Sequence, residues 1–491
     1  MTPFILAIDI GTTSTKGLAV TPSGAVLASY SKGYPTHYPK PGFAEQDPEI
    51  IFQTVVEVIQ TTSLKAGNSK SLLGVSFSCA MHSIMVVDNL GKPLTQLIIW
   101  ADMRSTLQAD ALKLKPESNL IYHQSGTPIH PMSPLCKLVW MKEEQPELFS
   151  STNKFISIKE YIFFKLFGEY KVDYSIASAT GLFDTNNLVW SSEALREAGV
   201  NSTKLSQPVS PYFQFKSLHP ELAVKLGVQS NTPFVIGASD GCLANLGSGA
   251  MDEGDMSITI GTSGAVRMVS REYKKDEQQR IFNYRLDEHV FIVGGATNNG
   301  AVLLSWFAEN IEKVKHDAKA FDVDAFSITD TEGLIFLPYV LGERAPIYDA
   351  YAKGVFFGVG IHHKTAHFKR AILEGICFEI QSIAQAVEET VGSVKHVIAS
   401  GGFTKSDLWV QLMADVLGKT VEVDSRSDAS AMGAAIMGFK ALDLTYTPPL
   451  DKKPKIFIPN ETSHQRYLKA FELFRSLYRN LKTDFPKLKD L

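Results

Sequence analysis

Cysteine is rare in this chain, and neither sign of charge dominates. The formal net charge of −4 gives no basic field for nucleic acid or an anionic membrane. No apolar run is long enough to span a bilayer, and the first one lacks the basic start of a signal peptide and contains Asp9. The four cysteines are scattered among apolar or small residues, which argues against a disulfide framework and a zinc-binding spacing; they are Cys79, Cys136, Cys242 and Cys377. We therefore expect a cytoplasmic protein that binds neither nucleic acid nor membrane.

The rest of the composition is typical of a globular protein with more than one core. With 491 residues, 44% apolar and 20% charged, the chain is long enough for two or three domains. Predicted strands and helices are mixed in both halves, which favours an α/β fold. A Gly-rich, acidic stretch at 247–255 suggests a boundary, so we expect an N-terminal domain over 1–246 and a C-terminal domain over 247–491.

Two short stretches, far apart in the chain, share one pattern. Leu6–Gly17 reads LAIDIGTTSTKG, and Ser257–Val266 reads SITIGTSGAV. Each is an apolar run that stops at Gly-Thr, continues with small hydroxyl residues and becomes apolar again, which predicts a β-hairpin with a tight turn. The N–H groups and hydroxyls of such turns can hold phosphate oxygens. Either copy alone could be an ordinary hairpin, but the pair suggests a duplicated fold that grips one polyphosphate from both sides.

The first of these stretches also carries two charged residues. Asp9 lies in the middle of the predicted strand, where Asp is depleted, and Lys16 follows the turn. A carboxylate beside a phosphate-binding turn is an ordinary way to hold Mg²⁺, directly or through water. Asp9 is therefore the candidate metal residue.

A second carboxylate follows a predicted strand in the segment VIGASDGCLANLGSG (235–249). The strand is expected to end at Gly237, and Asp240 occupies a glycine-flanked turn before a helix of small residues. Nothing bulky would keep this carboxylate from a substrate. Because Asp is also a favoured N-cap, it could equally cap a helix that begins near Cys242. Spacing alone leaves both interpretations open.

The segment IIWADMR (98–104) is a candidate for contact with a sugar. In an extended conformation, Trp100, Asp102 and Arg104 would point the same way and offer an aromatic face, a carboxylate and a guanidinium. A core tryptophan beside a surface Asp–Arg pair explains the segment as well. Met81 and His82 stand at a junction between two predicted strands, where ligand contacts are often made, although a lone histidine is more often structural.

Glycines mark a further candidate site in the second half. A predicted strand at 396–400 is followed by GGFTKSD and by a helix over 408–417. Glycine lets a base or phosphate approach the backbone, and the start of a helix attracts anions. This order of elements suits the nucleotide side of a site.

Together, these segments resemble the FGGY carbohydrate kinases, a family with the actin/hexokinase/Hsp70-like fold. DIGTTSTK resembles the family's first phosphate loop, TIGTSG the second, and GGFTKSDLWVQLMADVLG the adenosine segment. The family's two signature segments are similar to residues 132–144 and 354–374. The resemblance covers nearly the whole chain. It implies an α/β protein of two duplicated, ribonuclease H-like ATPase domains with a cleft between them, the N-terminal one binding the sugar and the C-terminal one the nucleotide.

The resemblance also implies roles for single residues and two ligands, ATP and Mg²⁺. Asp240 matches the catalytic base that takes the proton from the substrate hydroxyl, and Asp9 matches the carboxylate that organises the metal. The positions matched to the nucleotide are Thr12, Thr13, Lys16, Gly261, Thr262, Gly300, Gly401, Gly402 and Ser406.

Within the family, AMHS, IIWADMRS and GTPIHPMSPLCKLVW are most similar to gluconokinases. This implies ATP-dependent phosphorylation of D-gluconate to 6-phospho-D-gluconate. Xylulose kinase, or another ketose or polyol kinase, is the alternative, and a non-catalytic nucleotide-binding module is a more distant one. Family members are often dimers, so a homodimer is also implied. The sugar would contact Met81, His82, Trp100, Asp102 and Arg104, and the candidates for binding its carboxylate are Arg104, His82, His130 and Lys137.

Overall fold

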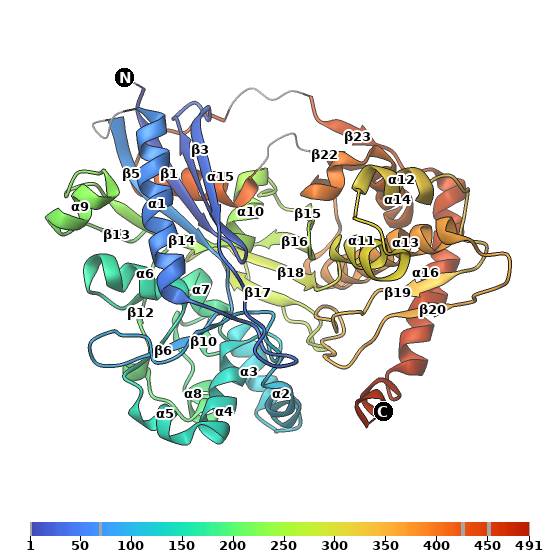
Figure 1. Cartoon of the computed structure of the whole chain (residues 1–491), viewed down its shortest axis with the longest axis horizontal. Helices are drawn as coiled ribbons and strands as arrows, with labels where there is room; N and C mark the ends of the chain where they lie inside the picture. The colour runs from blue at the N-terminus through green and yellow to red at the C-terminus, as the bar shows by residue number, and fades with distance from the viewer. Residues whose placement is uncertain (1, 68–70, 424–427, 449–452, 491) are drawn as a thin grey trace.

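The structure, a computed structural model, describes residues 2–67, 71–423, 428–448 and 453–490. Two large β-sheets, each flanked by helices, form the two halves of the molecule (Figure 1). The first sheet has six strands, in the spatial order β13 (Gln214–Phe215), β14 (Phe234–Ser239), β5 (Leu72–Cys79), β1 (Phe4–Ile10), β2 (Ser14–Val20) and β3 (Val26–Gly33).

The second sheet has seven strands and belongs to the other half. Their spatial order is β17 (Phe282–Arg285), β18 (Phe291–Thr297), β16 (Gly264–Ser270), β15 (Asp255–Ile260), β21 (His396–Ser400), β22 (Val421–Val423) and β23 (Lys455–Phe457).

The two sheets repeat one topology. In the first, β1 pairs antiparallel with β2 and parallel with β5; in the second, β15 pairs antiparallel with β16 and parallel with β21. Both predicted phosphate hairpins therefore exist, and each stands at the centre of its sheet. In the first hairpin Asp9 lies opposite Lys16 across the ladder. The predicted α/β fold of two duplicated halves is confirmed.

Long helices cover the sheets and bury one apolar face each. α1 (Pro48–Ala66) packs on β1, β2 and β3, and its N-cap Asp47 accepts a hydrogen bond from the N–H of Glu49. α13 (Thr365–Val391) packs on β16 and β18, and most of its length is buried. α16 (Glu461–Leu481) packs on α14 (Asp407–Leu417), and its buried Tyr467, Phe471 and Phe474 contact the ring of Phe378 on α13.

The chain between β5 and β14 forms a mainly helical layer of the first half. Residues 172–184 contain the end of β9 (Lys171–Asp173), α7 (Tyr174–Ser178) and β10 (Phe183–Asp184). Asp173 caps α7 by accepting from the N–H of Ile176, a signal hidden among small polar residues. The other helices of this layer are α2 (Thr106–Lys113), α3 (Ser118–Ser125), α4 (Pro134–Glu144), α5 (Pro146–Ser151), α6 (Ile158–Phe167), α8 (Ser192–Ala198) and α9 (Pro220–Leu226).

Two short helices cross between the halves, with almost no space between their backbones. They are α10 (Asp240–Ser248) and α15 (Ala429–Ala441), and α15 also packs on β1 and β5 of the first sheet. A Cβ atom at Gly247 would lie 1.9 Å from the carbonyl oxygen of Ala429, and one at Gly433 would lie 2.0 Å from that of Leu243. Only glycine permits this approach. The predicted domain boundary after residue 246 falls inside α10 and stays a prediction.

In the part of the chain that the structure describes, we find no helix with the length and apolarity needed to cross a membrane.

The helix crossing predicts a stability effect. Gly433→Ala forces a methyl group against the backbone of α10, so we expect it to lower the free energy of unfolding by about 1–3 kcal/mol, as overpacking does. Ser430→Ala, on the same helix but half-buried, should change it by less than about 0.5 kcal/mol. Urea unfolding followed by circular dichroism measures both. Equal midpoints for the two variants would contradict the close crossing.

Candidate active site

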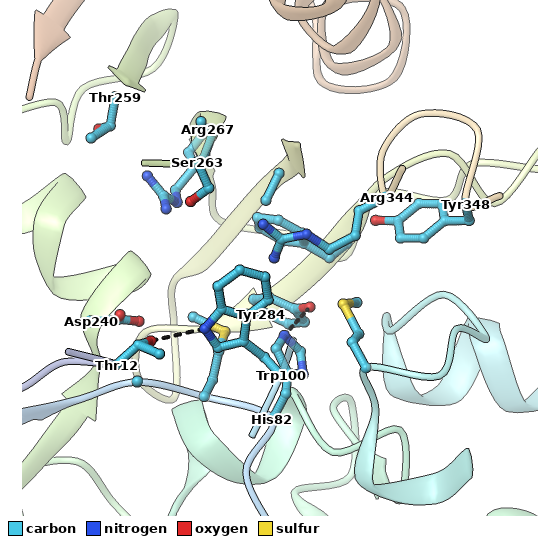
Figure 2. Close-up of a pocket in the computed structure, with 17 residues that line it drawn as sticks. Thr12, His82, Trp100, Asp240, Thr259, Ser263, Arg267, Tyr284, Arg344 and Tyr348 are labelled. Atoms are coloured by element: carbon cyan, nitrogen blue, oxygen red, sulfur yellow. Dashed lines mark hydrogen bonds between the residues drawn. The ribbon is translucent and has the colours of Figure 1, made fainter. Parts of the chain in front are cut away.

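A cavity of about 180 Å³ opens between the two halves, at the ends of the two phosphate hairpins. Residues predicted to bind phosphate, sugar and proton share its walls, and Figure 2 shows them converging. The first half contributes Thr12, Met81, His82, Trp100 and Asp240. The second half contributes Ser263, Arg267, Tyr284, Arg344 and Tyr348, among others.

Asp240 is the first residue of α10 and reaches the cavity. The N-cap of this helix is Ser239, whose Oγ accepts from the N–H of Cys242 at 3.4 Å. The alternative interpretation of Asp240 as the cap is therefore wrong, and its carboxylate remains available to a ligand. Its Oδ1 accepts one hydrogen bond, from the N–H of Gly241 at 2.7 Å. Burial raises the pKa of Asp240, and the nearby charge of Arg267 opposes this shift.

A buried polar network holds the backbone on which Asp240 stands. Lys159 on α6 donates to Oδ2 of Asp173 at 2.7 Å and to the carbonyl of Ala238 at 3.2 Å. Ser175 on α7 accepts from the N–H of Ser239 and donates to its Oγ at 2.8 Å. Because these groups are almost fully buried, the hydrogen bonds to Ala238 and Ser239 hold the end of β14 in place.

Asp9 lies near the end of β1, in a buried environment with other carboxylates nearby. Ser78 donates to its Oδ1 at 2.6 Å. Burial raises the pKa of Asp9 to about 7, and the negative charges of Asp240 and Asp428 add to the shift. A divalent cation would relieve this crowding of carboxylates. Among the described residues no three His, Cys, Asp or Glu side chains form a cluster that could hold a metal, so a cation here would also need phosphate and water oxygens, as Mg²⁺ does with ATP.

The first phosphate hairpin is held in place on both sides of its turn. Thr12 lines the cavity, and its Oγ1 accepts from Nε1 of Trp100 at 2.8 Å (Figure 2). Thr13, at the turn, is exposed, and its carbonyl accepts from the N–H of Tyr34. Lys16 forms an ion pair with Asp428 of the second half, so this cation already bridges the two halves.

The second phosphate hairpin gathers three of the predicted nucleotide glycines. Gly300 packs against the turn at Gly261 and Thr262, and its N–H donates to the carbonyl of Thr262 at 3.2 Å. A Cβ at Gly300 would lie 2.7 Å from the carbonyl oxygen of Gly261. Gly401 has a φ of +94°, and a Cβ there would lie 2.5 Å from the carbonyl oxygen of Ile260. At these glycines the segments that follow β15 and β21 therefore pack together through main-chain atoms.

The other two nucleotide residues follow directly. Gly402 begins the 3₁₀ turn η4 (Gly402–Lys405), and Ser406 is the N-cap of α14, accepting from the N–H of Trp409 at 3.2 Å. Their predicted contact with the nucleotide stays a prediction.

The structure separates the three residues expected to face a sugar together. The segment after Ile99 turns instead of extending, because the N–H of Asp102 donates to the carbonyl of Ile99. Trp100 lines the cavity, but Asp102 and Arg104 do not. They form an ion pair with Nη2–Oδ2 at 2.7 Å, buried rather than at the surface. The guanidinium of Arg104 also stacks on Phe43, so this pair is structural.

Met81 and His82 lie where the sequence predicts, in the cavity wall. His82 has a φ of +65°, and its two ring nitrogens meet the carbonyl of Ala179 at 2.7 Å and the hydroxyl of Tyr284 at 3.2 Å. Burial lowers the pKa of His82 to about 3, so the ring is neutral. Its contact with Tyr284 joins the two halves beside the cavity.

Sequence reasoning missed Arg267 and Arg344, the two cations of the cavity wall. Arg267 lies within β16 and Arg344 at the end of the apolar run 335–346. Burial lowers the pKa of both guanidinium groups. A charged residue inside a predicted strand was the signal that identified Asp9, and the same signal points to Arg267.

Comparisons with known proteins agree with this architecture. The model for the N-terminal domain of the FGGY family of carbohydrate kinases matches residues 4–247, and that for the C-terminal domain matches residues 256–442. Gluconokinase of Bacillus subtilis (strain 168) is 38% identical over 510 residues, covering 100% of this chain and 98% of that protein. Xylulose kinase of the same strain is 28% identical, covering 98% and 97%.

Two solved structures that share the fold of this chain are named for different substrates. A gluconate kinase from Lactobacillus acidophilus superposes with a TM-score of 0.92 at 32% identity, covering 99% of this chain and 100% of that one. A ligand-bound xylulose kinase from the same organism gives the same values. Structural similarity thus establishes the fold and leaves the sugar open.

The network under Asp240 gives a prediction. Lys159→Met leaves Asp173 charged and unpaired in the core, so we expect a loss of about 3–5 kcal/mol in the free energy of unfolding. Lys165→Met, on the same helix but in an exposed ion pair with Glu49, should cost less than about 1 kcal/mol. Chemical denaturation measures both. Similar losses would show that Lys159 is not the buried partner described.

Proposed function

Because the chain belongs to the FGGY family of carbohydrate kinases, we propose that it transfers the γ-phosphoryl group of ATP to D-gluconate, giving 6-phospho-D-gluconate. Two gluconokinases of Bacillus are 38–39% identical along nearly the whole chain, against 27–28% for the xylulose kinases of Bacillus subtilis and Lactococcus lactis. The observation that supports this chemistry is that the carboxylate of Asp240 does not serve as the N-cap of α10 and faces the same cavity as Thr12 of the first phosphate hairpin.

Asp240 acts as the general base in this proposal. Its carboxylate accepts the proton of the sugar hydroxyl while the oxygen of that hydroxyl attacks the γ-phosphorus; the bond from this phosphorus to the oxygen that bridges it to the β-phosphate breaks, and ADP leaves. Phosphoryl transfer depends on positioning and charge neutralisation more than on covalent chemistry. The buried network of Lys159, Asp173 and Ser175 supports this role, because it fixes the backbone of Ser239 next to the base.

The two hairpins hold the phosphates of ATP. N–H groups and hydroxyls at Thr12 and Thr13 approach from the first half, and those at Gly261 and Thr262 from the second. Lys16 exchanges its bond to Asp428 for a phosphate oxygen. Asp9 would hold Mg²⁺, which, when bound with ATP, supplies charge neutralisation at the phosphates.

Two hydrogen bonds join the halves close to Tyr348 in the cavity wall. The hydroxyl of Tyr351 donates to Oδ2 of Asp110 at 2.9 Å, and Nζ of Lys113 donates to the carbonyl of Tyr348 at 3.0 Å. A closed cavity excludes water, which strengthens charge interactions and limits hydrolysis of ATP.

Phosphorylation of xylulose or a related ketose is the second candidate. The equal similarity to the solved xylulose kinase favours it. An ADP-release assay with MgATP against D-gluconate, D-xylulose, L-ribulose and glycerol decides between them. Turnover on gluconate alone supports the proposal, and turnover on a ketose instead overturns the substrate while leaving the mechanism.

We also propose a cytoplasmic location and a homodimer. The four cysteines are unpaired and buried, which suits a reducing compartment. Light scattering coupled to gel filtration tests the dimer.

Loss of the base should be specific to chemistry. Asp240→Asn keeps the shape of the side chain and removes its basicity, so we expect kcat with gluconate to fall by about 10²–10⁴-fold. ATP affinity, measured by calorimetry, should change by less than about threefold. Asp484→Asn, at an exposed position, is the control with unchanged kcat. Wild-type turnover in Asp240→Asn would refute the assignment.

The raised pKa of Asp240 predicts the pH dependence. As the pH falls below this pKa, the base takes up a proton and the rate declines, so the acid limb of kcat/KM should have its midpoint above the ordinary value of about 4. The residual activity of Asp240→Asn should lack that limb. A midpoint at or below 4 in the wild type would contradict the burial of this carboxylate.

A further inference from the structure

Two guanidinium groups in the cavity wall each have a donor nitrogen without a hydrogen-bond partner among the described residues. Nη1 of Arg267 and Nε of Arg344 are both buried, and neither finds an acceptor among the described residues. Both side chains line the cavity, Arg344 next to Trp100 and Arg267 near Ser263 (Figure 2). A buried donor on a cation is costly when it stays unpaired, so these atoms mark a place where an acceptor is missing.

Each guanidinium is held in position without that acceptor. Arg344 donates from Nη2 to the carbonyl of Thr297 at 3.1 Å and lies over the ring of Trp100, with Cζ 4.7 Å from the centroid. Arg267 passes close to Gly241, where a Cβ would meet its Nη2 at 3.2 Å and its Nε at 3.3 Å. The absence of a side chain at Gly241 makes room for the guanidinium. Arg344 is therefore preorganised, which lowers the entropic cost of binding, and Arg267 has the space to reach the same cavity.

The cations expected to bind a sugar carboxylate are already occupied. The three protons of Lys137 go to the carbonyls of His82, Ile99 and Met132, at 2.7–2.9 Å. Arg104 is committed to Asp102 and Glu45.

The two candidate histidines are not placed to bind the sugar carboxylate either. The neutral ring of His82 uses both of its nitrogens, as described above. His130 has an unpartnered Nε2 as well, but unlike the two arginines it does not line the cavity.

We propose that Arg267 and Arg344 together bind the carboxylate of the sugar acid and select it against uncharged sugars. This assignment rests on the proposed function. A carboxylate offers acceptors to both orphaned donors at once, and such charge-assisted bonds are about twice as strong as neutral ones. A ketose has no anionic group for this place and leaves both cations unpaired, which is how polar sites reject analogues.

The same charges orient the substrate. Asp240 repels a second carboxylate, whereas the arginines attract it, so the acid group turns toward the guanidinium groups and a hydroxyl toward the base. Arg267 and Arg344 would then determine which hydroxyl receives the phosphate as well as which sugar is accepted.

A cycle of protein and ligand changes tests this pair. We would measure kcat/KM for D-gluconate and for D-gluconamide, its uncharged amide, with the wild type, Arg267→Gln and Arg344→Gln. Each variant should lose about 10–100-fold on gluconate, since one charged hydrogen bond is removed, and less than about fivefold on gluconamide. Arg285→Gln, which alters a buried arginine outside the cavity, should leave the ratio of the two substrates unchanged.

The outcomes separate the two claims. If the wild type does not phosphorylate gluconate, the proposed function fails. If it does, and an arginine variant loses equally on both substrates, that arginine serves the phosphoryl group or the fold and the carboxylate assignment is wrong. No loss on either substrate would overturn it as well. Thermal unfolding of each variant, with Arg267→Lys as a variant that keeps the charge, excludes a general loss of structure.

Discussion

The contact on which this structure depends is the crossing of α10 and α15. Gly247 and Gly433 bring the two backbones into contact, and side chains of both helices share one hydrophobic cluster with residues of both sheets, among them Ala7, Val269 and Ile292. α10 begins with Asp240, so the element that joins the halves also carries the proposed base. The position of the base relative to both hairpins is therefore set by packing between main chains, which tolerates almost no change in side-chain volume.

Burial then gives the cavity its electrostatic character. It raises the pKa of Asp9 and Asp240 and lowers that of Arg267 and Arg344, so groups of both signs are less stable as ions here than in water. They are close enough to influence one another but are not joined in ion pairs within the cavity. In the proposed enzyme, the ligands complete these pairs: Mg²⁺ for Asp9 and the sugar carboxylate for the arginines. Functional sites often keep such costs in the free protein and recover them on binding.

The sequence was sufficient for the fold because the fold is local and repeated. Each hairpin is specified by a few residues around Gly-Thr, and the second copy removes the ambiguity of the first. The role of Asp240 could not be read from the sequence, since an Asp in a turn before a helix can be either the N-cap or a base. The structure shows that Ser239 is the N-cap of α10. The extended interpretation of Trp100, Asp102 and Arg104 failed because alternation holds only in a strand, and a turn after Ile99 redirects the chain.

The choice of sugar shows what neither similarity nor motif could provide. Structures described as gluconate kinase and xylulose kinase match this chain equally well, so the backbone does not encode the difference. The residues that carry it in our proposal come from two elements, β16 and the loop at Arg344, brought together only by folding. Their sequence contexts do not mark them as partners, and the more obvious cation, Lys137, is consumed by three carbonyls. Whether a cation can bind a ligand depends on whether its donors already have acceptors within the protein. Those acceptors are known only once the folded cavity is known.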